Sequence, residues 1–359
     1  MQKERLLGKK EIRKNGKAIQ MEKMTYGMLS KYRTELMGIA AVSVLITHAS
    51  DTIVVSDMPL FFQMLSKIGT LVGSQMYMFF FLSGMGSWFS YEKNKDAVIY
   101  WKNRAKRTVV PYLLLSVVAY AILDLCLHHD FIGFILDLIC VSFYTKHVGA
   151  WYVAAILMLY MLYPLLHALS QINQKAPLIV AIGIGVAYYV LTSDTPFSGN
   201  KAYSLESHWG GVAAGSIAFL IGQYCAPKIK SNQKYNMMSL LILFMMWIFR
   251  KLLWKTAPTK LDVLYYMLLG IIGVFIWPIV FEKIRSRRCM NLLKRMGGIS
   301  LELYLTNIYI NSLFGQIGSP LNWLGITDST NTGRYCFVLF FGILISVFIT
   351  KYRVKRGEP

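Results

Sequence analysis

Residues 36–54 read LMGIAAVSVLITHASDTIV, an apolar run with a single histidine near its end. A helix rises about 1.5 Å per residue and needs roughly 20 mainly apolar residues to cross a hydrocarbon core about 30 Å thick. This stretch therefore predicts a membrane-spanning helix. The pattern as a whole predicts an all-α fold, a polytopic transmembrane helix bundle of about ten spans. The other candidate spans are 68–90, 107–127, 148–169, 177–192, 209–226, 236–254, 261–282, 297–318 and 334–350.

The composition agrees with a membrane protein. Of 359 residues, 55% are hydrophobic and 16% are charged, and the mean hydropathy is +0.45. These values exclude a soluble globular enzyme, a disordered chain and a small disulfide scaffold. The five cysteines form no CxxC motif and no Cys/His pair with the spacing of metal ligands. We therefore expect no metal site.

The net charge of +20 raises the alternatives of nucleic-acid binding and membrane topology, and the positions of the basic residues decide between them. Ten Lys or Arg lie within residues 1–33, which contain no apolar segment typical of a signal peptide. With ten spans, most of the other basic residues lie in loops on that same side, as the positive-inside rule requires. We expect a multi-pass protein of the plasma membrane with both termini cytosolic and no nucleic-acid partner. Its parts are a basic tail 1–33, one transmembrane domain 34–350 and a tail 351–359.

A further apolar piece, residues 131–145, is short for a span. Counting it as an eleventh span would move the basic stretches 227–235 and 283–296 to the outer side, against the positive-inside bias. We therefore expect residues 131–145 to form a re-entrant or interfacial helix on the outer side.

His48 is the candidate catalytic residue. It lies roughly 14 residues into the first span, in the outer half of the bilayer, where an ionisable side chain is costly. A neutral imidazole there can take a proton from a hydroxyl group. Asp51 follows three residues later, so its carboxylate can orient the ring across one helix face. The alternatives are a histidine hydrogen-bonded between helices or near the headgroups, and a solvated aspartate at the helix end.

A basic cluster, Lys102, Arg104, Lys106 and Arg107, lies immediately before the third span. Guanidinium groups bind phosphates through two parallel hydrogen bonds, so the cluster suits a phosphorylated cytosolic ligand. The alternative is ordinary anchoring of the helix on its cytosolic side.

Two other stretches carry weaker signals. FFFLSGMGSW, at 79–88, has small residues that allow close helix packing. A later span places polar groups about one turn apart, which line a polar interior or tie helices together. These polar groups are Glu302, Tyr304, Asn307 and Asn311.

Five stretches, in this order along the chain, resemble the acyltransferase-3 family of membrane O-acyltransferases. The resemblance covers nearly the whole span-forming chain. It implies transfer of an acyl group, usually acetyl, from cytosolic acyl-CoA to a hydroxyl of a carbohydrate or lipid-linked glycan at the outer face, a modification of cell-envelope polysaccharide. The stretches are GIAAVSVLITH at 38–48, FFFLSG at 79–84, NRAKRTVVPYLL at 103–114, GAWYVAAILMLYMLYPLL at 149–166 and GISLELYLTN at 298–307.

Carried over to this chain, the resemblance makes His48 the catalytic base or acyl-relay residue. It makes Arg104 and Arg107, with Lys106 beside them, the contacts for the CoA phosphates. Many members have an arginine eleven residues before the histidine. Here that position is Met37, and the nearest substitute is Arg33, one turn earlier. We expect the membrane module alone, without an appended soluble domain.

Two other classes are compatible with ten spans. A secondary transporter or flippase predicts inverted repeats and paired broken helices, and the sequence has neither. A catalytically inactive member that scaffolds a glycan-assembly complex would not need an intact His48. We therefore expect an integral-membrane enzyme with acetyl-CoA or another acyl-CoA as donor, an extracytoplasmic glycan as acceptor and the lipid bilayer around it.

Overall fold

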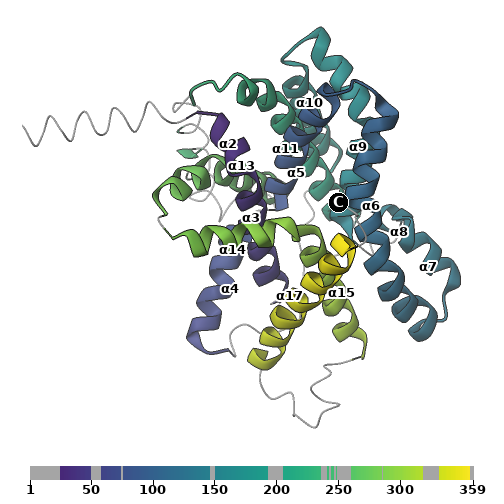
Figure 1. Ribbon diagram of the computed structural model, residues 1–359. Coiled ribbons are helices and arrows are strands. Elements are labelled where there is room, and N and C mark those ends of the chain that lie inside the picture. Colours follow the sequence, from purple (N-terminus) through teal and green to yellow (C-terminus); the bar gives the residue numbers. More distant parts are fainter. Residues whose placement is uncertain are drawn as a thin grey trace, which may run out of the picture.

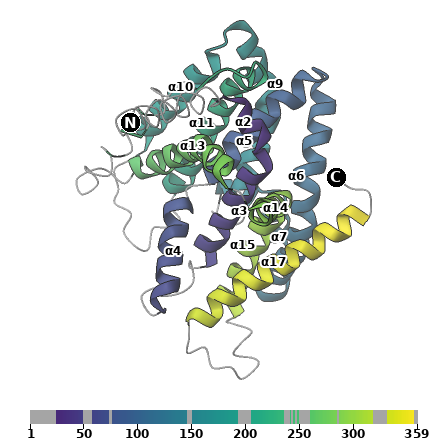
Figure 2. The same ribbon diagram turned by 60° about the vertical axis from the view of Figure 1, so that its left-hand side comes forward.

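The computed structural model describes most of the chain, and every regular element in the described ranges is a helix (Figure 1). The helices pack into one bundle, which the view turned by 60° also shows (Figure 2). The predicted all-α bundle is therefore confirmed. The described ranges are 25–49, 58–73, 76–145, 150–192, 205–235, 260–284, 286–317 and 331–355, with four isolated positions between 241 and 248.

The helices follow one another in chain order with short connections. Those of the first half are α2 (Gly27–Lys31), α3 (Arg33–Ala49), α4 (Leu60–Gly73), α5 (Met76–Glu92), α6 (Ala97–Tyr120), the π-helix η2 (Ala121–Leu127), α7 (Phe131–Leu138) and α8 (Val141–Thr145). Those of the second half are α9 (Trp151–Ile172), α10 (Ala176–Leu191), α11 (Leu205–Lys230), α13 (Lys260–Lys283), α14 (Arg287–Gly298), α15 (Ser300–Ile317) and α17 (Asn331–Lys355).

Helix α5 lies at the centre of the bundle. It is apolar nearly all round, which is typical of a helix that is buried on every side. It contacts α3, α6, α9, α11 and α13. Its buried side chains Met78, Phe80, Phe81 and Leu82 are among the largest fully buried groups of the described residues. The helices that carry the candidate site therefore pack around a rigid aromatic core.

Glycines let α5 and α11 approach until their backbones touch. A Cβ atom on Gly84 would clash with the carbonyl of Phe219, and one on Gly222 would clash with the carbonyl of Phe81. Small residues at a crossing are the usual means of close packing between transmembrane helices. The prediction of close packing at FFFLSGMGSW is thus confirmed at Gly84.

Four helices are long and apolar enough to cross a membrane, and two shorter apolar helices accompany them. They coincide with six of the predicted spans, so a multi-pass membrane protein is confirmed. The predicted span 236–254 lies almost wholly outside the described residues, and the total of ten remains a prediction. The four are Ala97–Leu127, Trp151–Ile172, Trp209–Lys230 and Val263–Lys283, and the two shorter ones are Ala176–Leu191 and Cys336–Lys351.

The predicted span 68–90 is wrong in its first part. Residues 68–73 belong to α4, and α5 begins as a separate helix at Met76. Both helices are apolar, so hydropathy is continuous along this part of the chain. Hydropathy measures apolar content and carries no information about where the backbone starts a new helix.

Residues 131–145 form two short helices, α7 and α8. The eight residues of α7 span only about 12 Å, well below the thickness of a hydrocarbon core. The α7 helix begins where the Asp130 side chain accepts a hydrogen bond from Gly133 N at 2.7 Å. It packs against α6 and η2. This agrees with the prediction of a short helix that does not cross the membrane.

Candidate functional site

Two adjoining cavities lie at the N-terminal end of α3. The first, which we call the tyrosine cavity, has a volume of about 350 Å³ and is lined by α3, α5, α6, α9 and the junction of α14 with α15. The second, the loop cavity, has a volume of about 450 Å³ and is lined by Ser30, the end of α5 and the start of α6. Arg33, Arg104 and Arg107 line both cavities. The two volumes therefore meet at three guanidinium groups.

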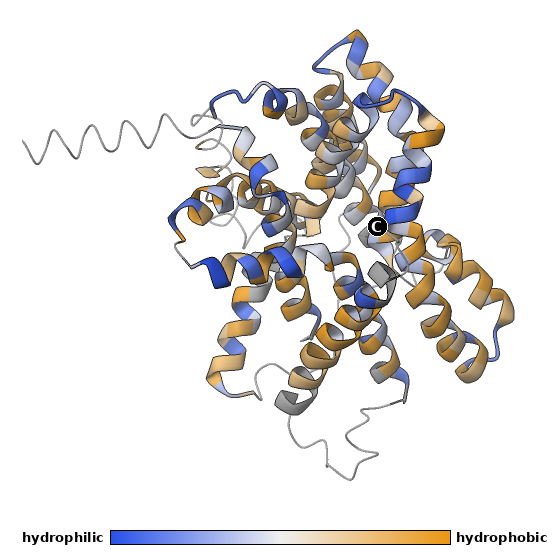
Figure 3. Cartoon of the chain, viewed as in Figure 1, coloured by the Kyte–Doolittle hydropathy of each residue, from blue (hydrophilic) through white to orange (hydrophobic). Residues whose placement is uncertain are grey.

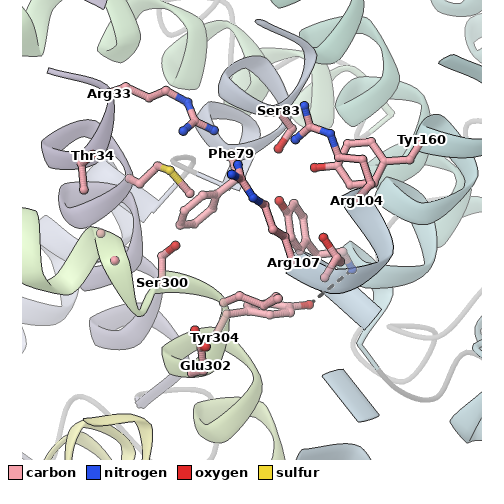
Figure 4. Close-up of a pocket in the computed structure, with 16 residues that line it drawn as sticks. Arg33, Thr34, Phe79, Ser83, Arg104, Arg107, Tyr160, Ser300, Glu302 and Tyr304 are labelled. Carbon is pink, nitrogen blue, oxygen red and sulfur yellow. Dashed lines mark hydrogen bonds between the residues drawn. The ribbon is translucent and has the colours of Figure 1, made fainter. Parts of the chain in front are cut away.

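Helix geometry brings these arginines together from distant parts of the sequence. Arg104 and Arg107 are three residues apart on α6, so they share one face of the helix. Arg33 is the first residue of α3 and lies across the tyrosine cavity from Arg104 (Figure 4). Lys106 is exposed and is not among the described residues that line either cavity. The structure thus groups Arg33 with the arginines of α6 and separates Lys106 from them.

Arg104 is held between aromatic rings. It is only 7% exposed, and its guanidinium lies 5.3 Å from the centroid of Tyr100 and 5.0 Å from that of Tyr160. Such cation–π contacts fix the side chain without using its hydrogen-bond donors. The buried Nε atoms of Arg33 and Arg104 have no hydrogen-bond partner. A buried donor without a partner costs about 1–3 kcal/mol, so the cavity suits a ligand with strong acceptors.

The charges of the lining residues favour an anion. Among the described residues that line the two cavities, four are basic and one is acidic, an excess of three positive charges. The acid is Glu302, which lines the tyrosine cavity and is 3% exposed. Figure 4 shows the three arginines along one side of the cavity, with Ser300, Glu302 and Tyr304 on the other. The cavity is therefore strongly cationic at one end only.

Tyr304 connects this cavity with His48. The tyrosine lines the cavity, and its ring lies edge-on to the imidazole with 6.4 Å between the centroids. The hydroxyl of Tyr304 accepts a hydrogen bond from Tyr152 N at 3.3 Å, which fixes the ring (Figure 4). His48 itself is half-buried and is not among the described residues that line the tyrosine cavity. The imidazole therefore lies behind the tyrosine as seen from the arginines.

The end of α3 is fixed by α15. Asn311 donates a hydrogen bond from Nδ2 to the carbonyl of His48 at 2.6 Å, and the same nitrogen lies 3.3 Å from Oδ1 of Asn307. The last carbonyls of a helix have no partner within the helix, so this contact satisfies one of them and fixes the position of His48. The polar groups of this span thus do both of the things expected from the sequence. Glu302 and Tyr304 line a cavity, and Asn311 ties two helices.

The remaining candidate residues differ in what the structure says of them. Asp51 lies outside the described residues, as do most residues of the loop before α11. Sequence reasoning missed Tyr152, Tyr160 and Phe79 as lining residues. Their signal was present, because each lies in one of the stretches that resemble the family, but an aromatic residue in an apolar span is far more often part of the core.

A helical membrane bundle with an anion-binding cavity that leads to a histidine defines a class of enzymes that transfer groups from phosphorylated donors within a membrane. The model of a family described as an acyltransferase domain matches residues 36–351. The chain belongs to this acyltransferase-3 family and is a membrane acyltransferase that transfers groups other than aminoacyl groups. No curated protein and no solved structure matches the chain.

Proposed function

We propose that the protein is an O-acyltransferase. It moves an acyl group, in the first instance acetyl, from cytosolic acyl-CoA to a hydroxyl of an extracytoplasmic carbohydrate or lipid-linked glycan. One observation carries the proposal: an arginine-lined cavity ends at Tyr304, whose ring contacts His48. A site for phosphates and a general base thus lie along one path. This arrangement suits a donor with phosphates at one end and a thioester at the other.

The phosphates of the donor bind Arg33, Arg104 and Arg107. Hydrogen bonds between guanidinium and phosphate are charge-assisted and roughly twice as strong as neutral ones. The unpaired Nε atoms of Arg33 and Arg104 are donors that such a ligand satisfies. Exposed Lys106 adds long-range attraction for the anionic donor without direct contact.

The pantetheine arm then extends through the tyrosine cavity toward Tyr304, so the thioester approaches His48 while the nucleotide stays with the arginines. His48 takes the proton of the acceptor hydroxyl as general base. The oxygen attacks the thioester carbonyl, the new ester C–O bond forms, and the C–S bond breaks. The leaving thiolate recovers the proton from His48. No proton is gained or lost overall.

The walls of the tyrosine cavity exclude water from this chemistry. Met37, Phe79 and Leu301 form an apolar lining beside Tyr304. A thioester that reaches bulk water near an activated base is hydrolysed, so a dry approach protects the donor. The acyl group therefore reaches the acceptor without the whole CoA molecule crossing the membrane, in a plasma-membrane protein with both termini cytosolic.

The test is acyl transfer by the purified full chain in lipid vesicles, with acetyl-CoA as donor and total envelope glycans as acceptor. His48→Ala should lower the rate constant for transfer by about 10²- to 10⁴-fold, as expected for loss of a general base, while CoA affinity stays unchanged. His128→Ala, at an exposed position remote from the cavity, is the control. Full transfer by a normally folded His48→Ala variant would remove the mechanism. Movement of glycan across vesicles without acyl-CoA would instead indicate a transporter.

A further inference from the structure

Helix α14 is unlike the other helices of the bundle in its charge. It begins after Ser286, whose hydroxyl accepts a hydrogen bond from Cys289 N at 3.3 Å, and runs RRCMNLLKRMGG. In Figure 3 it lies as a largely hydrophilic helix across helices that are mostly hydrophobic. It carries four basic residues and no acidic one. Their charges repel one another unless an anionic partner lies beside them.

The two faces of α14 differ. Met290 and Leu293 are half-buried and Met296 is buried, and all three pack against the core of the bundle. The opposite face is exposed and holds Arg287, Arg288, Asn291 and Arg295, with exposed Lys294 at its edge. Leu292 lies at the border of the two faces and is 60% exposed. A helix with a basic face and an exposed apolar edge is typical of helices that lie in the membrane interface.

Backbone contacts couple α14 to the candidate site. A Cβ atom on Gly38 of α3 would clash with the carbonyl of Leu293, and one on Gly297 would clash with the carbonyl of Thr34. The two helices therefore touch at two points close to Arg33. Gly297 and Gly298, at the end of α14, also line the tyrosine cavity. Any shift of α14 changes the wall of this cavity, because no side chain lies between the two backbones to absorb it.

We propose that the exposed basic face of α14 binds the headgroups of anionic phospholipids, and that this binding holds the wall of the tyrosine cavity in the conformation that accepts the donor. Charge complementarity and the exposed Leu292 select a lipid surface as the partner, since the leucine enters the interface while the arginines meet the phosphates. The coupling to the donor rests on the proposed function. The lipid binding does not.

The first experiment measures lipid binding directly. The full chain, purified in detergent, is mixed with phosphatidylglycerol or with phosphatidylcholine of the same acyl chains, and retained lipid is counted by native mass spectrometry. The wild type should retain phosphatidylglycerol preferentially. The triple variant Arg287→Gln, Arg288→Gln, Arg295→Gln should lose about fivefold of this preference per residue, on the order of 100-fold in total. The triple variant Lys102→Gln, Lys175→Gln, Lys351→Gln removes the same charge from exposed positions elsewhere and should keep the preference.

The second experiment measures the donor. In nanodiscs with increasing phosphatidylglycerol, the apparent KM for acetyl-CoA of the wild type and of the control variant should fall several-fold, and that of the α14 variant should stay constant. Equal lipid preference in the α14 variant and the wild type would overturn the proposal. Lost preference with an unchanged lipid response of KM would overturn the coupling. If no acyl transfer occurs in any nanodisc, the proposed function fails while the binding result still decides the lipid site.

Discussion

Arg33 and Met37 lie one turn apart on α3, and both line the tyrosine cavity. The cavity is long enough along the helix axis that either position can present a side chain to it. Arg33 also lines the loop cavity, and its guanidinium lies close to Gly86, where a side chain would crowd it. A guanidinium one turn earlier than usual for the family therefore still reaches the anion-binding region.

Removing Arg33 should weaken the donor more than the acceptor. Loss of one charge-assisted hydrogen bond costs about 1.5–3 kcal/mol, so Arg33→Gln should raise the dissociation constant of CoA by about 10- to 100-fold. Lys31→Gln is the control, because Lys31 is exposed, lines neither cavity and forms its hydrogen bond with Glu282 at 2.6 Å. Calorimetric titration of both variants with CoA is the measurement. Equal CoA affinity in Arg33→Gln and the wild type would assign Arg33 to helix packing alone.

Asn311 should affect the reaction without affecting the donor. Asn311→Ala removes the hydrogen bond to the His48 carbonyl, so the end of α3 loses a fixed position. A small misplacement of a catalytic group can cost about 10²-fold in rate, so the rate constant for transfer should fall by about 10- to 100-fold with an unchanged KM for acetyl-CoA. Ser346→Ala is the matched control, because it removes a buried hydrogen bond between α17 and Thr306 of α15 without touching His48. A similar loss in both variants would indicate general loosening of α15.

The sequence could predict His48, Arg104 and Arg107 as candidates because each is an ionisable group at the edge of an apolar run or within it, where its cost is visible without coordinates. It could not predict that Tyr304 joins the arginine-lined cavity to His48. That contact joins α3 to α15, more than 250 residues away along the chain. The value of an aromatic ring at such a place depends on what lies on either side of it, and only the packing of the helices determines this.

At the scale of the elements, the crossing of α5 and α11 should tolerate no added side chain. Gly222→Ala introduces a Cβ against the carbonyl of Phe81, and such overpacking costs typically 1–3 kcal/mol in the free energy of unfolding. Gly183→Ala, in α10, places its Cβ in open space and should be neutral or slightly stabilising through helix propensity. Thermal unfolding of the two variants in the same detergent is the measurement. A Gly222→Ala variant as stable as Gly183→Ala would contradict the close approach of the two backbones.

Hydropathy located the elements better than it located their ends. The spans at 107–127 and 261–282 coincide with long helices, because a continuous apolar run leaves a buried helix as the only way to satisfy its backbone. The helix α4 could not be separated from α5 in this way. Its apolar face is partly exposed at Leu60, Phe61, Met64 and Ile68, and only the packing of the opposite face on α3 shows that it is an independent element.

At the scale of the whole molecule, the proposed reaction requires the arginines and the acceptor to lie on opposite sides of the membrane. The α6 helix and η2 together run from Ala97 to Leu127, about 46 Å at the rise of an α-helix, which exceeds the hydrocarbon core. Arg104 lies near one end of this segment, and His128 follows its other end. The donor cavity and the connection before α7 are thus separated by one crossing.

Thiol labelling tests this sidedness with residues that the chain already offers. Cys289 is exposed on α14, which meets α3 beside Arg33, so it should lie on the donor side. In a background with the other cysteines replaced by serine, a membrane-impermeant maleimide should label Cys289 only after the cells are permeabilised. The variant His128→Cys, with Cys289 also replaced by serine, should be labelled in intact cells, because His128 is exposed at the opposite end of the α6 segment. Labelling of Cys289 in intact cells would place the three arginines on the outer side. Cytosolic acyl-CoA could not reach them there, so the proposed route of the donor would be excluded.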